Sequence, residues 1–577
     1  MSDTAAAGQA AQSWAAPVPE VPNRMAVLAC VLTGAFMILL DATIVNVAVP
    51  AIERNLHASY SAVEWVVSGY ALAYGLLLIP AGRLGDRVGH KKTYLAGLAG
   101  FTIASVLCGT AGSPAELIAW RVVQGAMAGF LNPPILAVIQ AIFPAKERGR
   151  AYGLYGAVAG LATALGPLAG GLLIAWNLHG WDWRPVFLVN LPIGIIGLIA
   201  AVRLVPESRS QEASPAASAD AAGEASAANN SFDLTGAGLI SAAMLLITFP
   251  LIQGQSSGWP PWTFACLGAA APVLAAFAWW EWRAIGRGRT PLVDIRLFRN
   301  RSFAAGTGVS LAYFAGFIGL LFVLSLYLQI GLGWSALHAG LAILPFAAGT
   351  FVGGAVSDQL ARRLGRGVLL AGAATVAVCT AAVILIIHQQ GASVSSLALL
   401  PALLVGGVGS GLVIAPSVDV VLSGVSWQDA GSASGVLGAS QRLGQAIGIA
   451  VAGVALFGSL AAGAPHAAAR AAPGLRRQLA AAGLSHRAVQ GGVAHFAGCF
   501  GRQSAAADPT ATPPGCGPGR DPAVSAAFGS AARHALASNF THAVQVAAWY
   551  ALGAIVLTFM LALLLPRRPR VSEGGDR

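Results

Sequence analysis

Charged residues are scarce in this chain of 577 residues, because Asp, Glu, Lys and Arg together make up only 10% of it. A soluble protein carries about 25% charged residues. Hydrophobic residues account for 56% of the chain, and so few charges cannot cover a soluble surface. This deficit argues against a soluble enzyme, a nucleic-acid-binding protein and a disordered scaffold.

The sequence also contains no pattern typical of a metal-binding or ATP-binding site. The six cysteines form no CxxC pair and no His/Cys spacing typical of a metal site, and no GxxxxGK[ST] sequence for ATP binding occurs. No Ser/His/Asp, paired-carboxylate or metal constellation stands within the apolar segments, so we expect neither an enzyme nor a bound metal. Cys499 and Cys516 share one long polar segment, where a disulfide and two free thiols are both open interpretations.

Long apolar runs are abundant instead. Each is long enough, at 1.5 Å per helical residue, to cross a hydrocarbon layer of about 30 Å. A membrane β-barrel would show alternating ten-residue strands, so the pattern favours helices. The predicted spans are 25–49, 61–82, 93–112, 114–140, 150–176, 185–205, 234–254, 262–282, 303–330, 336–358, 367–388, 396–422, 432–460 and 540–565.

The distribution of Lys and Arg predicts how these spans thread the membrane. Most of these residues lie in alternate connections, while the short connections on the other side hold only Arg54 and Arg184. By the positive-inside rule, both termini are cytoplasmic. The net charge of +11 is therefore an orientation signal and not a nucleic-acid-binding surface.

The spans fall into groups of six, two and six. An Ala/Ser-rich linker follows the sixth span and a basic segment follows the eighth. The segment 461–539 is rich in Ala, Gly and Pro, and we expect an outward-facing loop that carries short helices, for instance at 466–483. The predicted units are a tail at 1–24, a six-helix bundle at 25–205, a linker at 206–232, two extra helices at 233–283, a basic segment at 284–302, a second bundle at 303–566 and a tail at 567–577.

Two short stretches occupy equivalent places in the two bundles. Gly82 to Arg87 follows the second span, and Gly354 to Gln359, which includes Asp358, follows the tenth. Parallel repeats of this kind occur in transporters. Asp86 can accept hydrogen bonds from a helix N-terminus or pair with Arg87. The stretch that begins at Gly82 is either a latch that holds one conformation of the protein, or a basic turn that only fixes the orientation of the spans in the membrane.

Asp41 is the most informative residue, because it lies deep in the first span. An ionised carboxylate is costly there, so it must face a cavity or be protonated. Burial favours the protonated form of a carboxyl group, which a proton-coupling site requires. Thr43 and Asn46 are candidate polar neighbours. A helix-packing role for Asp41 is the alternative.

Arg121 lies inside the fourth span, close to Gln124. Arginine does not readily lose its proton, so its charge must be paired or hydrated. Asp41 and Glu64 are both candidate partners. Separation of such a pair would change the proton affinity of the carboxylate and so link conformation to protonation, whereas a fixed structural ion pair is the alternative. Arg442, in the thirteenth span, invites a weaker form of the same argument.

Small residues recur in the fifth span, from Gly156 to Gly160 and again at Gly166, Gly170 and Gly171. Such spacing permits close helix packing, and Pro167 can kink the helix. The pattern is compatible with a helix–helix contact that opens and closes during function. It is equally compatible with a static contact.

Five stretches together resemble the major facilitator superfamily, and specifically its fourteen-span drug:proton antiporters. They correspond in order to the motifs of the first span, the loop between spans two and three, span four, span five and the entry to span six. The stretches are LDATIVNVAVP at 40–50, GRLGDRVGHKK at 82–92, RVVQGAMAG at 121–129, GPLAGG at 166–171 and WRPVFLVNLPIG at 183–194.

The resemblance implies an all-α polytopic membrane protein, with two six-helix bundles plus two inserted helices and a substrate path between the bundles. It assigns proton coupling to Asp41 and Arg121, to which we add Glu64 as a candidate. The implied gating latch comprises Gly82, Asp86, Arg87 and the equivalent Asp358. The implied antiporter motif comprises Gly166, Pro167, Gly170 and Gly171.

The expected function is therefore export of lipophilic small molecules across a bacterial inner membrane, driven by protons and without a cofactor. A dedicated exporter of one metabolite and a membrane sensor that has lost transport are the alternatives. The last six spans hold almost no central carboxylate, which favours neutral, weakly acidic or monovalent substrates. The sequence leaves open whether a periplasmic adaptor binds. Candidate cavity residues are Asn46, Tyr70, Tyr74, Gln124, Tyr313, Phe314, Phe317 and Arg442.

Overall fold

The structure is a computed structural model. It describes residues 23–58, 60–177, 180–207, 233–256, 258–287, 289, 291–422, 425, 429–505, 513–517 and 521–566. The predicted tails at 1–24 and 567–577 and the linker at 206–232 lie almost entirely outside these residues.

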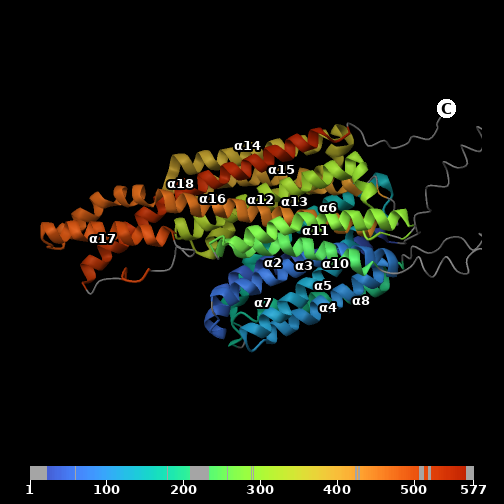
Figure 1. Ribbon diagram of the computed structural model, residues 1–577, viewed down its shortest axis with the longest axis horizontal. Coiled ribbons are helices and arrows are strands. Elements are labelled where there is room, and N and C mark those ends of the chain that lie inside the picture. Colours follow the sequence, from blue (N-terminus) through green and yellow to red (C-terminus); the bar gives the residue numbers. More distant parts are fainter. Residues whose placement is uncertain are drawn as a thin grey trace, which may run out of the picture.

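Within the described residues the chain is helical, and fourteen segments are long and apolar enough to cross a membrane. Figure 1 shows them as a bundle of roughly aligned helices. The first six spans, here called the N half, are α2 (Arg24–Leu56), α3 (Tyr60–Val88), α4 (His90–Thr110), α5 (Pro114–Ile142), α6 (Ala145–Trp176) and the pair α7 (Pro185–Leu188) with α8 (Asn190–Leu204).

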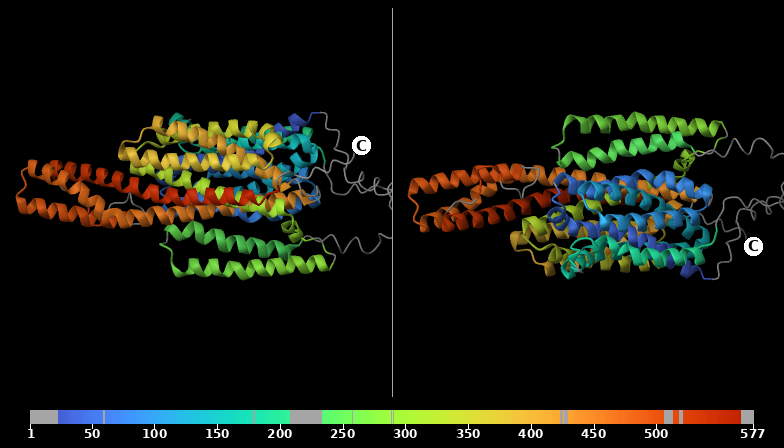
Figure 2. Two further views of the ribbon diagram at one scale, coloured as in Figure 1. Left: turned by 90° about the horizontal axis from the view of Figure 1, so that it is seen from above. Right: turned by 90° about the horizontal axis from the view of Figure 1, so that it is seen from below.

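The last six spans, here called the C half, are α12 (Arg301–Leu326), α13 (Ala336–Leu364), α14 (Gly367–Gln390), α15 (Ser396–Leu422), α16 (Ala430–Ala481) and α18 (Pro522–Leu563). The inserted spans, α10 (Leu234–Ser256) and α11 (Pro261–Gly286), form a pair on one side of the bundle (Figure 2). α10 packs against α3 and α16. Three short helices lie between spans. η2 (Ile295–Arg299) precedes α12, η3 (Tyr327–Gly331) follows α12, and η4 (Gly391–Ser393) follows α14.

Local sequence sets where several helices begin. The Ser113 hydroxyl accepts from the backbone N–H of Glu116 at the start of α5, and Pro114 takes the first helical position. Asn300 caps α12 and Ser335 caps α13 in the same way. The turn between α3 and α4 passes through Gly89 at φ 107°, a backbone conformation that glycine adopts without steric cost.

α2 begins and α18 ends at the same end of the bundle, on the right of Figure 1. We call this end the terminus face. At the opposite end, α16 and α18 continue past the other helices and pack with α17 (His486–Ala505). We call residues 461–505 and 522–539 the extension.

The structure confirms helix over most of 466–483, but the expectation that 461–539 forms a long loop with only short helices was wrong. α16 runs without a break to Ala481, with Pro465 and Pro473 inside it, and α18 already begins at Pro522. Alanine is the best helix former, and its small side chain lets these helices pack closely. The buried core of the extension includes Ala467, Leu475, Phe496, Phe500 and Ala531. Cys499 and Cys516 form a disulfide there, which resolves the question that the sequence left open.

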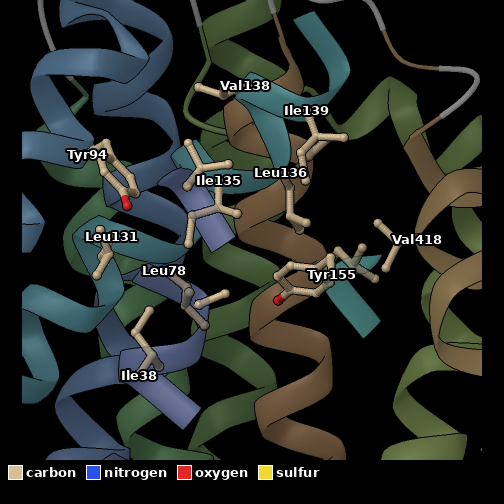
Figure 3. Close-up of a cluster of buried hydrophobic side chains, with 14 of the residues drawn as sticks. Ile38, Leu78, Tyr94, Leu131, Ile135, Leu136, Val138, Ile139, Tyr155 and Val418 are labelled. Atoms are coloured by element: carbon tan, nitrogen blue, oxygen red, sulfur yellow. The ribbon is translucent and has the colours of Figure 1, made fainter. Parts of the chain in front are cut away.

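A large apolar core lies toward the terminus face, between Asp41 and the helix ends. Figure 3 shows its side chains pointing toward one another from several helices, among them Leu78 of α3, Leu136 of α5 and Tyr155 of α6. Val418 of α15 joins the same cluster, so the core includes residues from both halves.

Candidate functional site

The centre of the N half holds a buried ion pair. Arg121 of α5 donates from Nη1 to Oδ2 of Asp41 on α2 at 2.5 Å. Asp41 is 0% and Arg121 1% exposed, so bulk water does not solvate either charge. Of the two partners that the sequence offered for Arg121, the structure pairs it with Asp41. The Glu64 side chain lies outside the described part of the chain.

Amide side chains surround this ion pair. Gln124 lies one helical turn after Arg121 and donates from Nε2 to Oδ1 of Asp41 at 2.8 Å. Its own Oε1 accepts from Arg121 at 2.8 Å. Asn190, the first residue of α8, donates to the same Oδ1 at 3.1 Å and to the Ser105 hydroxyl at 3.0 Å. Asp41 thus accepts three hydrogen bonds, as a buried carboxylate requires.

The Arg121 side chain is held from two further directions. Its Nε donates to the backbone carbonyl of Val66 at 2.9 Å, and its guanidinium lies 4.2 Å from the centroid of the Tyr70 ring. The Tyr70 hydroxyl in turn donates to the carbonyl of Ile38 on α2. The network therefore joins five helices, α2, α3, α4, α5 and α8, around the carboxylate of Asp41.

Other predicted cavity residues make no hydrogen bond to Asp41 or Arg121 among the described residues, although the Tyr74 ring lies beside that of Tyr70. The Tyr74 ring stacks under the Arg442 guanidinium at 4.3 Å and so connects α3 to α16. Tyr313 and Phe317 stack at 5.6 Å within the C half, and Tyr313 donates to Ser410. Asn46 is exposed and donates only to the backbone of its own helix.

The predicted latch joins the two halves near the terminus face. Oδ1 and Oδ2 of Asp86 accept from the backbone N–H groups of Gly431 and Ser432, at 2.7 and 2.8 Å. Asp86 therefore caps the first turn of α16, where unpaired N–H groups attract a carboxylate. Gly82 lies against the Gly431 carbonyl with no room for a Cβ atom. Of the two partners that the sequence offered for Asp86, the structure shows the helix N-terminus. Arg87 is exposed, and Arg83 approaches Asp86 at 3.8 Å.

Asp358 occupies the matching place in the C half. It lies on α13, accepts from Arg362 at 2.8 Å, and faces Gly149 at the start of α6 so closely that a Cβ there would collide with it. In each half, the second helix thus presents an aspartate to the fifth helix of the other half. The weak sequence repeat therefore corresponds to equivalent contacts.

The small-residue stretch of α6 packs against the helix that carries Asp41. A Cβ at Gly166 would collide with the Thr43 hydroxyl, and one at Gly170 would lie 2.9 Å from the Ile44 carbonyl. Gly171 faces open space. Pro167 lies within α6, but its side chain is outside the described part.

A family model described as the Major Facilitator Superfamily matches residues 31–449, which run from α2 into α16. The chain belongs to the major facilitator superfamily. It is a multi-pass membrane transporter and not an enzyme, and its fourteen spans agree with the branch that its motifs resemble.

One relative extends the match over nearly the whole chain. The sequence is 36% identical over 570 residues to the "Probable actinorhodin transporter" of Streptomyces coelicolor, covering 98% of this chain and 96% of the relative. It is 33% identical to the "Tetracenomycin C resistance and export protein" of Streptomyces glaucescens, over 74% of this chain and 75% of that one. The crystal structure of the human organic anion transporter MFSD10 aligns with a TM-score of 0.54 at 18% identity, covering 74% of this chain and 93% of that one, which supports the fold.

Proposed function

We propose that this major facilitator exports lipophilic small molecules across the bacterial cytoplasmic membrane in exchange for protons. The observation that carries the proposal is the buried Asp41–Arg121 pair with its amide donors. A carboxylate at this depth is expensive to maintain, and such residues mark ion and proton pathways in transporters.

The proposed coupling follows from charge balance. When Asp41 takes up a proton, Arg121 loses its counter-charge and is left as an uncompensated buried cation. α2 and α5 must then rearrange to hydrate or pair the guanidinium. Release of the proton restores the pair. Proton binding thus favours one conformation and proton release the other.

The proposed orientation places the terminus face in the cytoplasm, because that side collects the Lys and Arg residues. In that orientation, the contacts among Gly82, Asp86 and Gly431 close the cytoplasmic end. The latch would open to admit substrate from the cytoplasm.

The relatives support export of antibiotic-like compounds as the substrate class. Two are named for actinorhodin and tetracenomycin C, and another is named a multidrug resistance protein. A dedicated exporter of one metabolite is the second candidate function, because the relative that matches 98% of this chain, extension included, is named for a single compound.

The test uses proteoliposomes that contain the full chain and a pH-sensitive dye, under an imposed pH gradient. A panel of lipophilic compounds is added to wild type, Asp41→Asn and the control Asp182→Asn, which removes a carboxylate before α7. We expect proton movement that depends on the added compound in wild type and control, and none in Asp41→Asn.

Compound flux that persists in Asp41→Asn with its proton movement intact would reject Asp41 as the coupling residue. Response to many panel members would favour a multidrug exporter, and response to one would favour the dedicated exporter. Binding without any flux would favour a sensor that has lost transport.

A further inference from the structure

A second arginine lies deep in the bundle, on the C half. Arg442 is twelve residues into α16, about 18 Å from Ala430 at 1.5 Å per residue. That places it near the middle of a hydrocarbon layer of about 30 Å. A side chain at this depth does not reach the terminus face, although long cationic side chains near helix ends do. Arg442 is partly buried.

Arg442 differs from Arg121 in having no anion beside it. Its Nη1 donates to Oε1 of Gln445 at 2.8 Å, and its guanidinium stacks on Tyr74. Among the described residues, none of the ion pairs within 4.0 Å involves Arg442. Because arginine keeps its proton, this site carries a permanent positive charge that the surrounding side chains do not neutralise.

The position of Arg442 is between the halves. Gly75 of α3 lies against it, since a Cβ there would be 3.9 Å from the Arg442 Cβ. Tyr74 also comes from α3, and Tyr155 of α6 lies close enough to interact electrostatically with the guanidinium. Transporters with repeated halves bind their cargo near the membrane midplane, where the repeats meet.

Aromatic rings connect Arg442 to the ion pair of the N half. The Tyr70 ring lies under Arg121, its centroid is 6.1 Å from that of Tyr74, and the Tyr74 ring lies under Arg442. Arg121 and Arg442 therefore lie at the two ends of the adjacent Tyr70 and Tyr74 rings.

We propose that Arg442 binds the anionic group, a carboxylate or phenolate, of an aromatic lipophilic substrate. This inference rests on the proposed export function and names its substrate class. Among the described residues, one guanidinium nitrogen of Arg442 donates to a protein acceptor, which leaves the other nitrogens for a ligand. A guanidinium can donate two parallel hydrogen bonds to the two oxygens of a carboxylate, and its positive charge repels organic cations. The Tyr74 ring supplies an apolar surface for the aromatic part.

The test measures equilibrium binding to the detergent-solubilised full chain, without a pH gradient. The probes are the fluorescent acid 9-anthroate and its neutral carboxamide, together with 2-naphthoate and 2-naphthamide. Variants are Arg442→Gln, Arg442→Lys and the control Arg203→Gln, which removes an exposed arginine at the end of α8. Gel filtration and thermal unfolding verify that each variant is folded.

We expect wild type and Arg203→Gln to bind at least one acid about tenfold or more tightly than its amide, as loss of a charge-assisted pair predicts. Arg442→Gln should abolish that preference, and Arg442→Lys should retain part of it. Equal binding of acids and amides by wild type, absence of acid binding, or an undiminished preference in Arg442→Gln would each overturn the proposal.

A parallel measurement with Asp41→Asn separates this inference from the proposed function. Asp41→Asn should keep the acid preference in binding while it loses proton movement in proteoliposomes. Loss of acid preference in Arg442→Gln combined with normal proton coupling in Asp41→Asn would reject the coupling scheme and keep Arg442 as the anion site.

Discussion

Asn190 donates a hydrogen bond to Oδ1 of Asp41 at 3.1 Å, although 149 residues separate them in the chain. The same amide nitrogen donates to the Ser105 hydroxyl, which fixes its orientation between α4 and α8. The carboxylate that stands out in the sequence is therefore positioned in part by an uncharged residue from the entry to the sixth span.

Replacement of Asn190 tests this positioning. Asn190→Ala removes one of the three donors to Asp41, and we expect the free energy of unfolding to fall by about 1–3 kcal/mol, the cost of an unsatisfied buried group. Denaturation in detergent measures the stability, and proteoliposome flux should fall in parallel. Thr110→Ala, an exposed position on α4, is the control and should change neither quantity.

The Asp41–Arg121 pair should behave as one unit in a double-mutant cycle. Arg121→Gln leaves an uncompensated buried carboxylate and should cost about 3–5 kcal/mol of stability. The double variant Asp41→Asn with Arg121→Gln carries no charge and should be more stable than the Arg121→Gln single variant. Thermal unfolding of the four proteins provides the comparison. Additive losses would show that the charges do not depend on each other.

Closure at the terminus face should depend on Gly82. Gly82→Ala places a methyl group against the Gly431 carbonyl, so α3 and α16 cannot keep their present distance. Spin labels at the exposed Val88 of α3 and Leu364 of α13 report the separation of the halves. We expect longer distances in Gly82→Ala than in wild type. Gly553→Ala, which faces open space, should leave the distance distribution unchanged, and an unchanged distribution in Gly82→Ala would contradict a closing contact.

The glycines of the α6 stretch should differ sharply in their tolerance of alanine. Gly166→Ala collides with Thr43 and should lower both stability and transport, because Asp41 lies only two residues from Thr43 on α2. Gly171→Ala meets nothing and should be neutral or stabilising by up to about 1 kcal/mol, as alanine is the better helix residue. Equal effects in thermal unfolding and flux assays would show that packing against α2 does not explain the stretch.

The fourteen spans could be predicted from the sequence because each is a long apolar run, and such runs need no knowledge of their neighbours. Asp41 and Arg121 stood out for the same reason, as charges inside apolar segments. Their contact confirms one of the two pairings that the sequence allowed. Their role in proton coupling stays a prediction.

Asn190 could not be identified as a partner of Asp41 from the sequence, because an uncharged amide near the start of a helix is common. The only signal was its place in the stretch at 183–194, where a family resemblance was noted without a role for the residue. The partner of Asp86 was equally out of reach, because a carboxylate that caps a helix 345 residues away depends on how the halves meet. The length of α16 was also out of reach, because a segment rich in Ala, Gly and Pro is typical of a loop, whereas α16 continues through Pro465 and Pro473.

The extension is continuous with the C half, and this has a mechanical consequence. α16 is a single helix of 52 residues, about 78 Å long at 1.5 Å per residue, with Arg442 near one end and the extension at the other. α18 runs beside it over much of that length, and the disulfide-bonded α17 braces their far ends. A small tilt of the C half within the membrane therefore becomes a large sweep of the extension outside it. The tip of the extension lies farther along α16 than Arg442 does, so any such tilt displaces the tip more than it displaces Arg442.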